Sequence, residues 1–347
     1  MQAIALSIVV PAYREARVLP ALFQALDRVC AGALCGAGLV EIVVVDDGSD
    51  DESWELIAAQ CARDSHYVGV RLSRNFGHQA ALGAGLEMAR GEAVVSMDAD
   101  LQDPPEVIPK MLAAHYEGYD VVYATRADRG TESWFKRVSA KWFYWAIEKM
   151  SGVPVPRNTG DFRLLSRRAL RELARLNESH RFLRGLVPWI GFPQSQVIYD
   201  RGDRAAGETH YPLRKMLRLA FDGIASMSAF PLRLAYGVSL LLFAVFVGYI
   251  LYALYGHFVK HSLLVPGWTS LMCAITIFGT IQLLLFGVFG EYLGRVYEQV
   301  KNRPLYIIRD VKRCPAAEAT AEPEAAREPL AAQEILGTGE QEAKRAA

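Results

Sequence analysis

Two acidic motifs have the residue types and spacing to bind a metal ion and a nucleotide. Asp98 and Asp100 stand one residue apart after an apolar run, where they can bind a hard divalent cation that also holds a diphosphate. The run DDGS at residues 46–49 follows another apolar run, with a glycine that allows a tight turn and a carboxylate that can bind a base or ribose. Either motif alone is more often a solvated turn, so the interpretation depends on their occurring together.

The apolar runs before these motifs predict the strands of an α/β nucleotide-binding domain. Nearly continuous β-branched runs, separated by helical stretches, indicate a mostly parallel sheet with helices on both faces. Ligands of such open sheets bind beyond the carboxyl ends of the strands, so we expect the polar motifs to share one edge. The predicted strands are Ser7–Val10, Glu41–Val45, Tyr67–Leu72, Ala93–Met97 and Tyr119–Tyr123.

Two apolar stretches predict a transmembrane hairpin after this domain, within residues 231–295. Residues 232–255 and about 269–290 are each long enough to cross roughly 30 Å of hydrocarbon at about 1.5 Å per residue, and Arg233 is their one charged residue. Their outer flanks are rich in Lys and Arg, whereas the connection holds only Lys260. The positive-inside rule therefore places both ends in the cytoplasm.

The segments beside the hairpin complete the expected organisation. Residues 1–210 form the α/β domain, and residues 211–230 have the mixed basic and apolar pattern of an interfacial helix or, equally, of an ordinary packed helix. Residues 296–314 are expected to be a cytoplasmic return segment. Residues 315–347 are rich in Ala, Glu and Pro and cannot bury a core, so we expect a disordered tail.

Composition excludes several classes of partner and site. Lys plus Arg and Asp plus Glu number 38 each, so no charge excess indicates nucleic-acid binding. The five cysteines lack paired C-x-x-C spacing, and no histidine has a second ligand at zinc spacing, so neither a zinc site nor a disulfide framework is predicted. A reducing compartment fits this cysteine usage.

The complete series of motifs resembles that of family 2 glycosyltransferases, over residues 6–308. The later motifs are similar to those of the bactoprenol glucosyltransferase and dolichyl-phosphate mannose synthase type. In chain order the motifs are VPAYRE (10–15), DDGSDD (46–51), RNFG (74–77), DADLQDPPE (98–106), NTGDFRLL (158–165), RFLRGL (181–186) and RGDRAAGETHY (201–211). The resemblance implies a GT-A-like fold and a polyprenyl phosphate acceptor.

The resemblance also implies roles for individual residues. Asp161 resembles the proposed catalytic base, but a phosphomonoester with a second pKa near about 6 hardly needs one, so positioning is an equally good role. His210 stands where the family usually has lysine, which leaves the charge of that loop in doubt. The implied sets are Pro11, Tyr13, Glu15, Asp46 and Asp98 for the nucleotide; Asp98, Asp100 and Gln102 for Mg²⁺ or Mn²⁺, with Asp100 and Asp161 catalytic; and Arg126, Arg137, Arg201 and Arg204 for the acceptor and its phosphate.

The expected reaction is inverting transfer of a hexose from a UDP-sugar to undecaprenyl phosphate at the cytoplasmic face of the inner membrane. UDP-glucose is the favoured donor, the product would serve cell-envelope glycan modification, and a homo-oligomer such as a tetramer is expected from the family. The alternatives are another donor, such as GDP-mannose or a UDP-modified arabinose, and a non-catalytic membrane partner that binds lipid phosphate. A transporter or a processive synthase would need more membrane helices.

Overall fold

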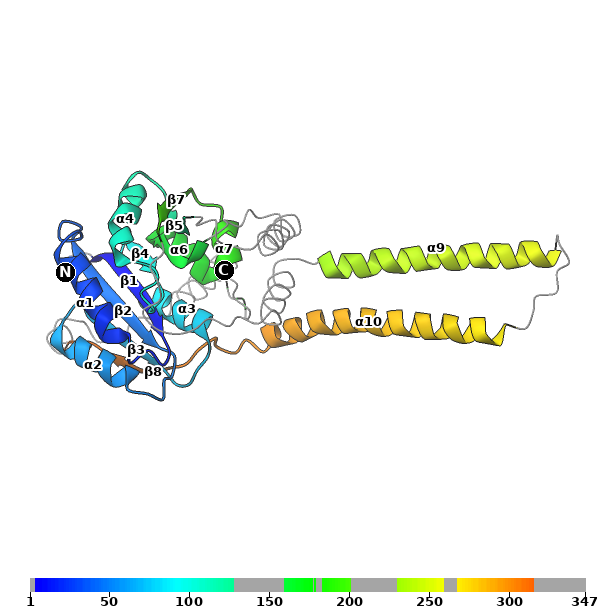
Figure 1. Ribbon diagram of the computed structural model, residues 1–347, viewed down its shortest axis with the longest axis horizontal. Coiled ribbons are helices and arrows are strands. Elements are labelled where there is room, and N and C mark those ends of the chain that lie inside the picture. Colours follow the sequence, from blue (N-terminus) through cyan, green and yellow to red (C-terminus); the bar gives the residue numbers. More distant parts are fainter. Residues whose placement is uncertain are drawn as a thin grey trace, which may run out of the picture. The chain divides into compact units, whose positions relative to one another are not determined.

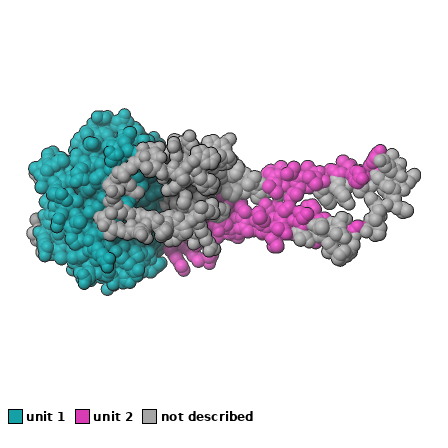
Figure 2. Space-filling model, in the orientation of Figure 1, with its two compact units in different colours: residues 1–148, 153–212, 304–347 teal, residues 149–152, 213–303 magenta. Residues whose placement is uncertain are grey.

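The computed structural model describes residues 4–127, 159–176, 178, 183–200, 230–258 and 267–314, and the predictions for residues 128–158, 201–229 and 315–347 lie outside this part. The chain divides into two compact units (Figure 2). Residues 1–148, 153–212 and 304–347 form the first unit, and residues 149–152 and 213–303 form the second. The first unit therefore contains chain from both sides of the second.

An eight-stranded mixed sheet is the centre of the first unit (Figure 1). All five strands predicted from the sequence are present, and β6, β7 and β8 are additional. Their bounds are β1 Ile4–Ala12, β2 Leu39–Asp46, β3 Tyr67–Leu72, β4 Ala93–Ser96, β5 Val121–Arg126, β6 Thr159–Ser166, β7 Gln194–Tyr199 and β8 Ile308–Lys312, in the order β7-β5-β6-β4-β1-β2-β3-β8.

The sheet is mixed, with β6 and β8 running antiparallel to the other six strands. β3, β2, β1 and β4 run parallel, as the sequence predicted. β6 lies antiparallel between β4 and β5, and β8 lies antiparallel on the outer edge of β3. Seven consecutive residues of β1 are buried, so this strand is covered on both faces, which explains its continuous apolar run.

Helices cover the sheet, and α3 begins at its carboxyl edge. Gly85 brings α3 against β1, because a Cβ there would lie 2.3 Å from Val9 Cγ1. Gly48 (φ 68°) lets the turn after β2 meet the turn after β3, since a Cβ there would lie 2.4 Å from the carbonyl carbon of Arg74. The helices of this unit are α1 Leu19–Ala31, α2 Ser53–Arg63, α3 His78–Met88, the 3₁₀ turn η1 Pro105–Val107, α4 Ile108–Tyr116, α6 Arg167–Arg175 and α7 Leu183–Trp189.

The second unit contains two long helices that contact each other, α9 Phe230–Phe258 and α10 Trp268–Val300. Within the described residues, one segment, Ile277–Val300 of α10, is long and apolar enough to cross a membrane, and none of it is buried. The apolar stretch found in α9, Tyr236–Val245, is shorter. The two predicted spans thus fall on two separate helices, of which α10 has the properties of a span.

β8 joins the chain beyond α10 to the sheet, although the sequence analysis placed it in a return segment. Gly69 pairs with Lys312 and Val70 with Val311, and the Ser73 amide donates a hydrogen bond to the Ile307 carbonyl at 2.9 Å. A five-residue strand with few buried side chains gives little apolar signal, which is why periodicity did not reveal it.

Removal of β8 should destabilise the first unit. Truncation after Arg303 should lower its unfolding temperature by roughly 5 to 10 °C, the effect of losing about 2 to 3 kcal/mol, because the β3 edge loses its partner and is open to aggregation. Truncation after Cys314 keeps β8 and is the matched control, with an unchanged unfolding temperature. Thermal unfolding in detergent measures both, and equal temperatures for the two truncations would refute a stabilising role of β8.

Candidate functional site

A cavity of about 420 Å³ opens at the carboxyl edge of the parallel strands. It is bounded by the segments that follow β1, β2, β3 and β4 and by the start of α3, so the polar motifs do share one edge. Five residues expected to bind nucleotide or metal line it: Pro11, Tyr13, Glu15, Asp98 and Asp100. The other lining residues are Ala12, Asp47, Asn75, Gly77, His78, Ala81 and Ala99.

Asp46 and Asp47, in the motif after β2, make different contacts. Asp46 is fully buried, accepts a hydrogen bond from the Ser49 amide at 3.1 Å and pairs with Arg71 Nε at 3.3 Å, and it does not line the cavity. Asp47 lines the cavity and accepts hydrogen bonds from the amides of Phe76 (2.8 Å) and Gly77 (2.9 Å). Both carboxylates therefore brace the turns that surround the cavity.

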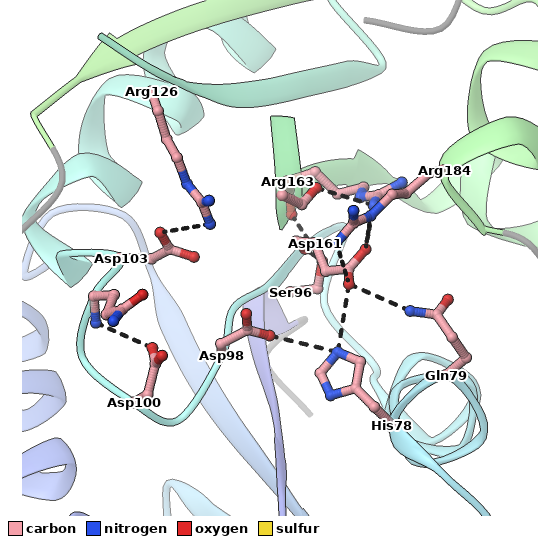
Figure 3. A network of polar contacts seen from close by, with 12 residues as sticks. His78, Gln79, Ser96, Asp98, Asp100, Asp103, Arg126, Asp161, Arg163 and Arg184 are labelled. Carbon is pink, nitrogen blue, oxygen red and sulfur yellow. Dashed lines mark hydrogen bonds and ion pairs between the residues drawn. The ribbon is translucent and has the colours of Figure 1, made fainter. Parts of the chain in front are cut away.

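Asp161 is the centre of a network of charged side chains on β6, α3 and α7 (Figure 3). Its Oδ1 accepts a hydrogen bond from Arg163 Nη2 at 2.7 Å, and Arg184 donates to both oxygens at 3.2 Å. Gln79 Nε2 donates to Oδ2 at 3.3 Å, and the Ser96 hydroxyl donates to the Asp161 carbonyl at 2.5 Å. The carboxylate is thus held from several sides.

These contacts fix the charge of Asp161. Burial alone would raise the pKa of its carboxyl, but the hydrogen bond from His78 and the charges of Arg163 and Arg184 outweigh burial and hold the pKa far below its usual range. Arg163 is itself buried, so the pair is a desolvated one in which each charge depends on the other. Asp161 is therefore ionised and fully engaged.

His78 is a site residue that the sequence analysis did not identify. Its Nε2 lies 3.4 Å from Asp161 Oδ2 and 3.5 Å from Asp98 Oδ1, so it stands between the two carboxylates (Figure 3). The hydrogen bond with Asp161 raises the pKa of its imidazole, although burial acts against this. Its place directly after the RNFG motif and at the first residue of α3 was the available signal.

The residues of the D-x-D motif fit a divalent cation. Asp98 Oδ1 and Gln102 Oε1 are buried and accept no hydrogen bond from the described residues, and the Gln102 amide donates to Asp100 Oδ1 at 3.1 Å. Burial raises the pKa of Asp98 and of Glu15, and neighbouring carboxylates, Asp100 among them, raise both further. Such a crowded carboxylate set is stabilised by a hard cation.

One further group of ligand atoms lies close enough to hold a metal ion. Among the described residues, His78, Asp98 and Asp161 offer ligand atoms within 4.8 Å of one another. This group differs from the predicted set of Asp98, Asp100 and Gln102 and shares only Asp98 with it. The two guanidinium groups on Asp161 oppose a second cation at that carboxylate.

The arginines assigned to the acceptor are only partly described. Arg126 ends β5, and its Nη2 lies 3.7 Å from Asp103 Oδ1 (Figure 3). Four residues of interest lie outside the described residues: Arg137, Arg201, Arg204 and His210, which stands where the family usually has lysine. Arg163 and Arg184 both pair with Asp161.

Comparisons with known proteins identify the family of this chain. The sequence model of Glycosyl transferase family 2 matches residues 7–174. The glycosyltransferase YkcC of Bacillus subtilis is 44% identical over 87% of this chain and 93% of its own. The SfII prophage-derived bactoprenol glucosyl transferase of Shigella flexneri is 39% identical over 89% of this chain and 98% of its own.

A solved structure, the mannosyl-3-phosphoglycerate synthase from Rubrobacter xylanophilus, is similar with a TM-score of 0.46 and 16% identity, over 66% of this chain and 74% of that chain. The sequence relatives carry the assignment, because they cover nearly the whole chain at high identity. The chain belongs to glycosyl transferase family 2 and is a glycosyltransferase.

Proposed function

We propose that the protein transfers a hexose, with UDP-glucose as the favoured donor, to undecaprenyl phosphate with inversion at the sugar. The observation that carries this proposal is the division of the site into an acidic part, at Asp98 and Asp100, and a basic part, at Arg163 and Arg184, with Asp161 and His78 between them. A nucleoside diphosphate with its cation suits the first part, and an anionic acceptor suits the second. The relative named bactoprenol glucosyl transferase supports this choice of donor and acceptor.

Asp98, Asp100 and Gln102 would hold Mg²⁺ or Mn²⁺, because their oxygens are the ligands that such cations prefer. Two of these oxygens, Asp98 Oδ1 and Gln102 Oε1, are buried and accept no hydrogen bond from the described residues. When bound, the cation balances the charge that develops on the departing nucleoside diphosphate. Pro11, Tyr13 and Glu15 line the same cavity, and we assign them to the nucleoside. Asp46 would act on the nucleoside only through the turn that it braces.

A transfer assay tests this function. Purified protein in detergent should move radiolabel from UDP-glucose into the organic phase with undecaprenyl phosphate and Mg²⁺ or Mn²⁺, and EDTA should abolish the transfer. Asp100→Ala should lower transfer at least about a hundredfold, as expected for loss of one main electrostatic contact, while the protein stays folded. Asp50→Asn, in an exposed pair with Arg14, is the control and should keep the wild-type rate.

Label from UDP-galactose or GDP-mannose instead of UDP-glucose would correct the donor and keep the reaction. Absence of transfer from all three donors, with nucleotide binding intact, would contradict the proposed reaction. That result would favour a rarer modified sugar, such as a UDP-modified arabinose, first and a non-catalytic partner that binds lipid phosphate second.

We propose that Asp161, which the buried Arg163 holds in place, positions the acceptor through the partly exposed Arg184 and does not act as a general base. A carboxylate whose pKa is held far below its usual range is a weak proton acceptor. The acceptor phosphate, with a second pKa near about 6, loses its proton to water at neutral pH. The structure thus favours the positioning role among the two that the sequence left open.

The pH profile of Asp161→Asn separates these roles. The variant should transfer at a rate lowered by about 10²-fold or more, because Arg163 and Arg184 lose their orienting charge, but its rate should still rise with pH through about 6 as the phosphate ionises. Asp120→Asn is the matched control, because Asp120 is also buried and paired with an arginine, Arg168, whereas only Asp161 of the two contacts His78, a residue that lines the cavity. If Asp161→Asn lost the rise in rate near pH 6 and Asp120→Asn kept it, Asp161 would be assigned the role of general base.

We propose that α9 and α10 form a hairpin that crosses the inner membrane twice, with both termini in the cytoplasm. The support is topological: β8 pairs with β3, so the chain that leaves the first unit before α9 returns to the same sheet after α10. Such a path allows only an even number of crossings. Large apolar side chains are exposed on both helices, including Leu240, Phe243, Leu283 and Phe286, as lipid contact requires.

Reporter fusions measure this topology. Alkaline phosphatase inserted after His261, between the helices, should be active, because it would reach the periplasm. A fluorescent protein fused after Ala347 should fluoresce, because it would stay in the cytoplasm. Phosphatase activity at the C-terminal position would contradict the hairpin and indicate a single crossing.

A further inference from the structure

Asp103, Arg126 and Tyr199 form a cluster that links the segment after β4 with the ends of β5 and β7. The Tyr199 hydroxyl donates a hydrogen bond to Asp103 Oδ1, and Arg126 Nη2 lies 3.7 Å from the same oxygen. Arg126 Nε donates to the Tyr199 hydroxyl at 3.4 Å. Asp103 follows Gln102 directly, Arg126 ends β5 and Tyr199 ends β7, so the cluster joins three separate segments.

The backbone holds Tyr199 and Arg126 side by side. They are register partners in the parallel pairing of β5 with β7, and the Ala127 amide donates to the Tyr199 carbonyl at 2.9 Å. The Tyr199 ring packs edge-on against Phe162, the neighbour of Asp161, with centroids 5.9 Å apart. The backbone pairing and the ring contact with Phe162 therefore fix the position of the hydroxyl.

Asp103 makes this cluster electrostatically demanding. The residue is fully buried, and its Oδ2 accepts no hydrogen bond from the described residues. A buried carboxylate of this kind requires compensation, which here comes from the Tyr199 hydroxyl and the Arg126 guanidinium. Burial and the bond to Asp103 raise the pKa of Tyr199 to about 12, so the hydroxyl keeps its proton at neutral pH.

The Arg126 guanidinium is paired with Asp103 and is also partly exposed to solvent. Its side chain is 30% exposed, and Gly160 leaves room for the guanidinium, because a Cβ there would lie 3.1 Å from Nη2. An arginine that is anchored by one set of donors and partly exposed can present the remaining donors to a phosphate.

We propose that Tyr199 is a positioning residue for the acceptor: its hydroxyl fixes Asp103 and thereby orients Arg126 towards the phosphate of the lipid. This inference rests on the proposed function and on the acceptor role that the family resemblance implies for Arg126. Tyr199 itself touches no substrate in this arrangement. Its loss should therefore affect the acceptor and leave the nucleotide sugar nearly unaffected.

Steady-state kinetics of Tyr199→Phe test the inference. The variant removes only the hydroxyl and should raise the KM for undecaprenyl phosphate about three- to tenfold, the effect of losing one hydrogen bond. The KM for UDP-glucose should change less than about twofold, within the small effect expected away from a contact. Tyr123→Phe is the matched control: Tyr123 is equally buried, on β5, and its hydroxyl has no hydrogen-bond partner among the described residues, so both KM values should stay unchanged.

A double-mutant cycle shows whether Tyr199 acts through Arg126. In an Arg126→Ala background, Tyr199→Phe should change the acceptor KM less than about twofold, because contacting residues are not additive. Three results would overturn the inference: full additivity of the two substitutions, an unchanged acceptor KM in Tyr199→Phe, or an equal rise of both KM values. In each case transfer by the wild-type protein would still uphold the proposed function. Absence of wild-type transfer from UDP-glucose, UDP-galactose and GDP-mannose would overturn both.

Discussion

The buried pairing of Asp161 with Arg163 and Arg184 is the interaction on which the site depends. It places fixed positive charge within a few ångströms of the carboxylates that crowd the cavity, with His78 between the two sets. A desolvated pair of this kind contributes little net stability, but removal of one partner costs much more than the pair provides. Its value is positional, because it keeps opposite charges apart in a site that must bind a cation and an anion together.

The strand order explains why β6 lies next to both the metal side and the acceptor side of the site. β6 lies between β4, which carries Asp98 and Asp100 at its end, and β5, which carries Arg126. Asp161 on β6 therefore stands between the metal side and the acceptor side of the cavity edge. Because β6 is antiparallel to β4 and β5, it is the start of this strand, which carries Asp161, that lies at the same edge as the ends of β4 and β5.

The parallel strands and the residues after them could be predicted from the sequence, because apolar runs and polar motifs are local signals. Asp98 and Asp100 follow this rule and line the cavity. His78, Tyr199 and Asp103 could not be predicted as partners, because their contacts join segments far apart in sequence. Asp47 replaces Asp46 at the cavity since adjacent residues point to opposite sides, a difference that the motif alone does not specify.

β8 has consequences for the order of folding. The β3 edge stays open until residue 312 has been synthesised, after both apolar helices of the second unit. An exposed parallel-sheet edge and unpaired apolar helices are both prone to association, so the chain passes through a vulnerable stage during synthesis. Insertion of the helices into a lipid phase during synthesis would shorten that stage. Only seven residues separate the end of α10 from the start of β8, so β8 can pair soon after α10 is inserted. The same closure makes the two helices an insertion within the transferase sheet, bounded on both sides by chain that belongs to it.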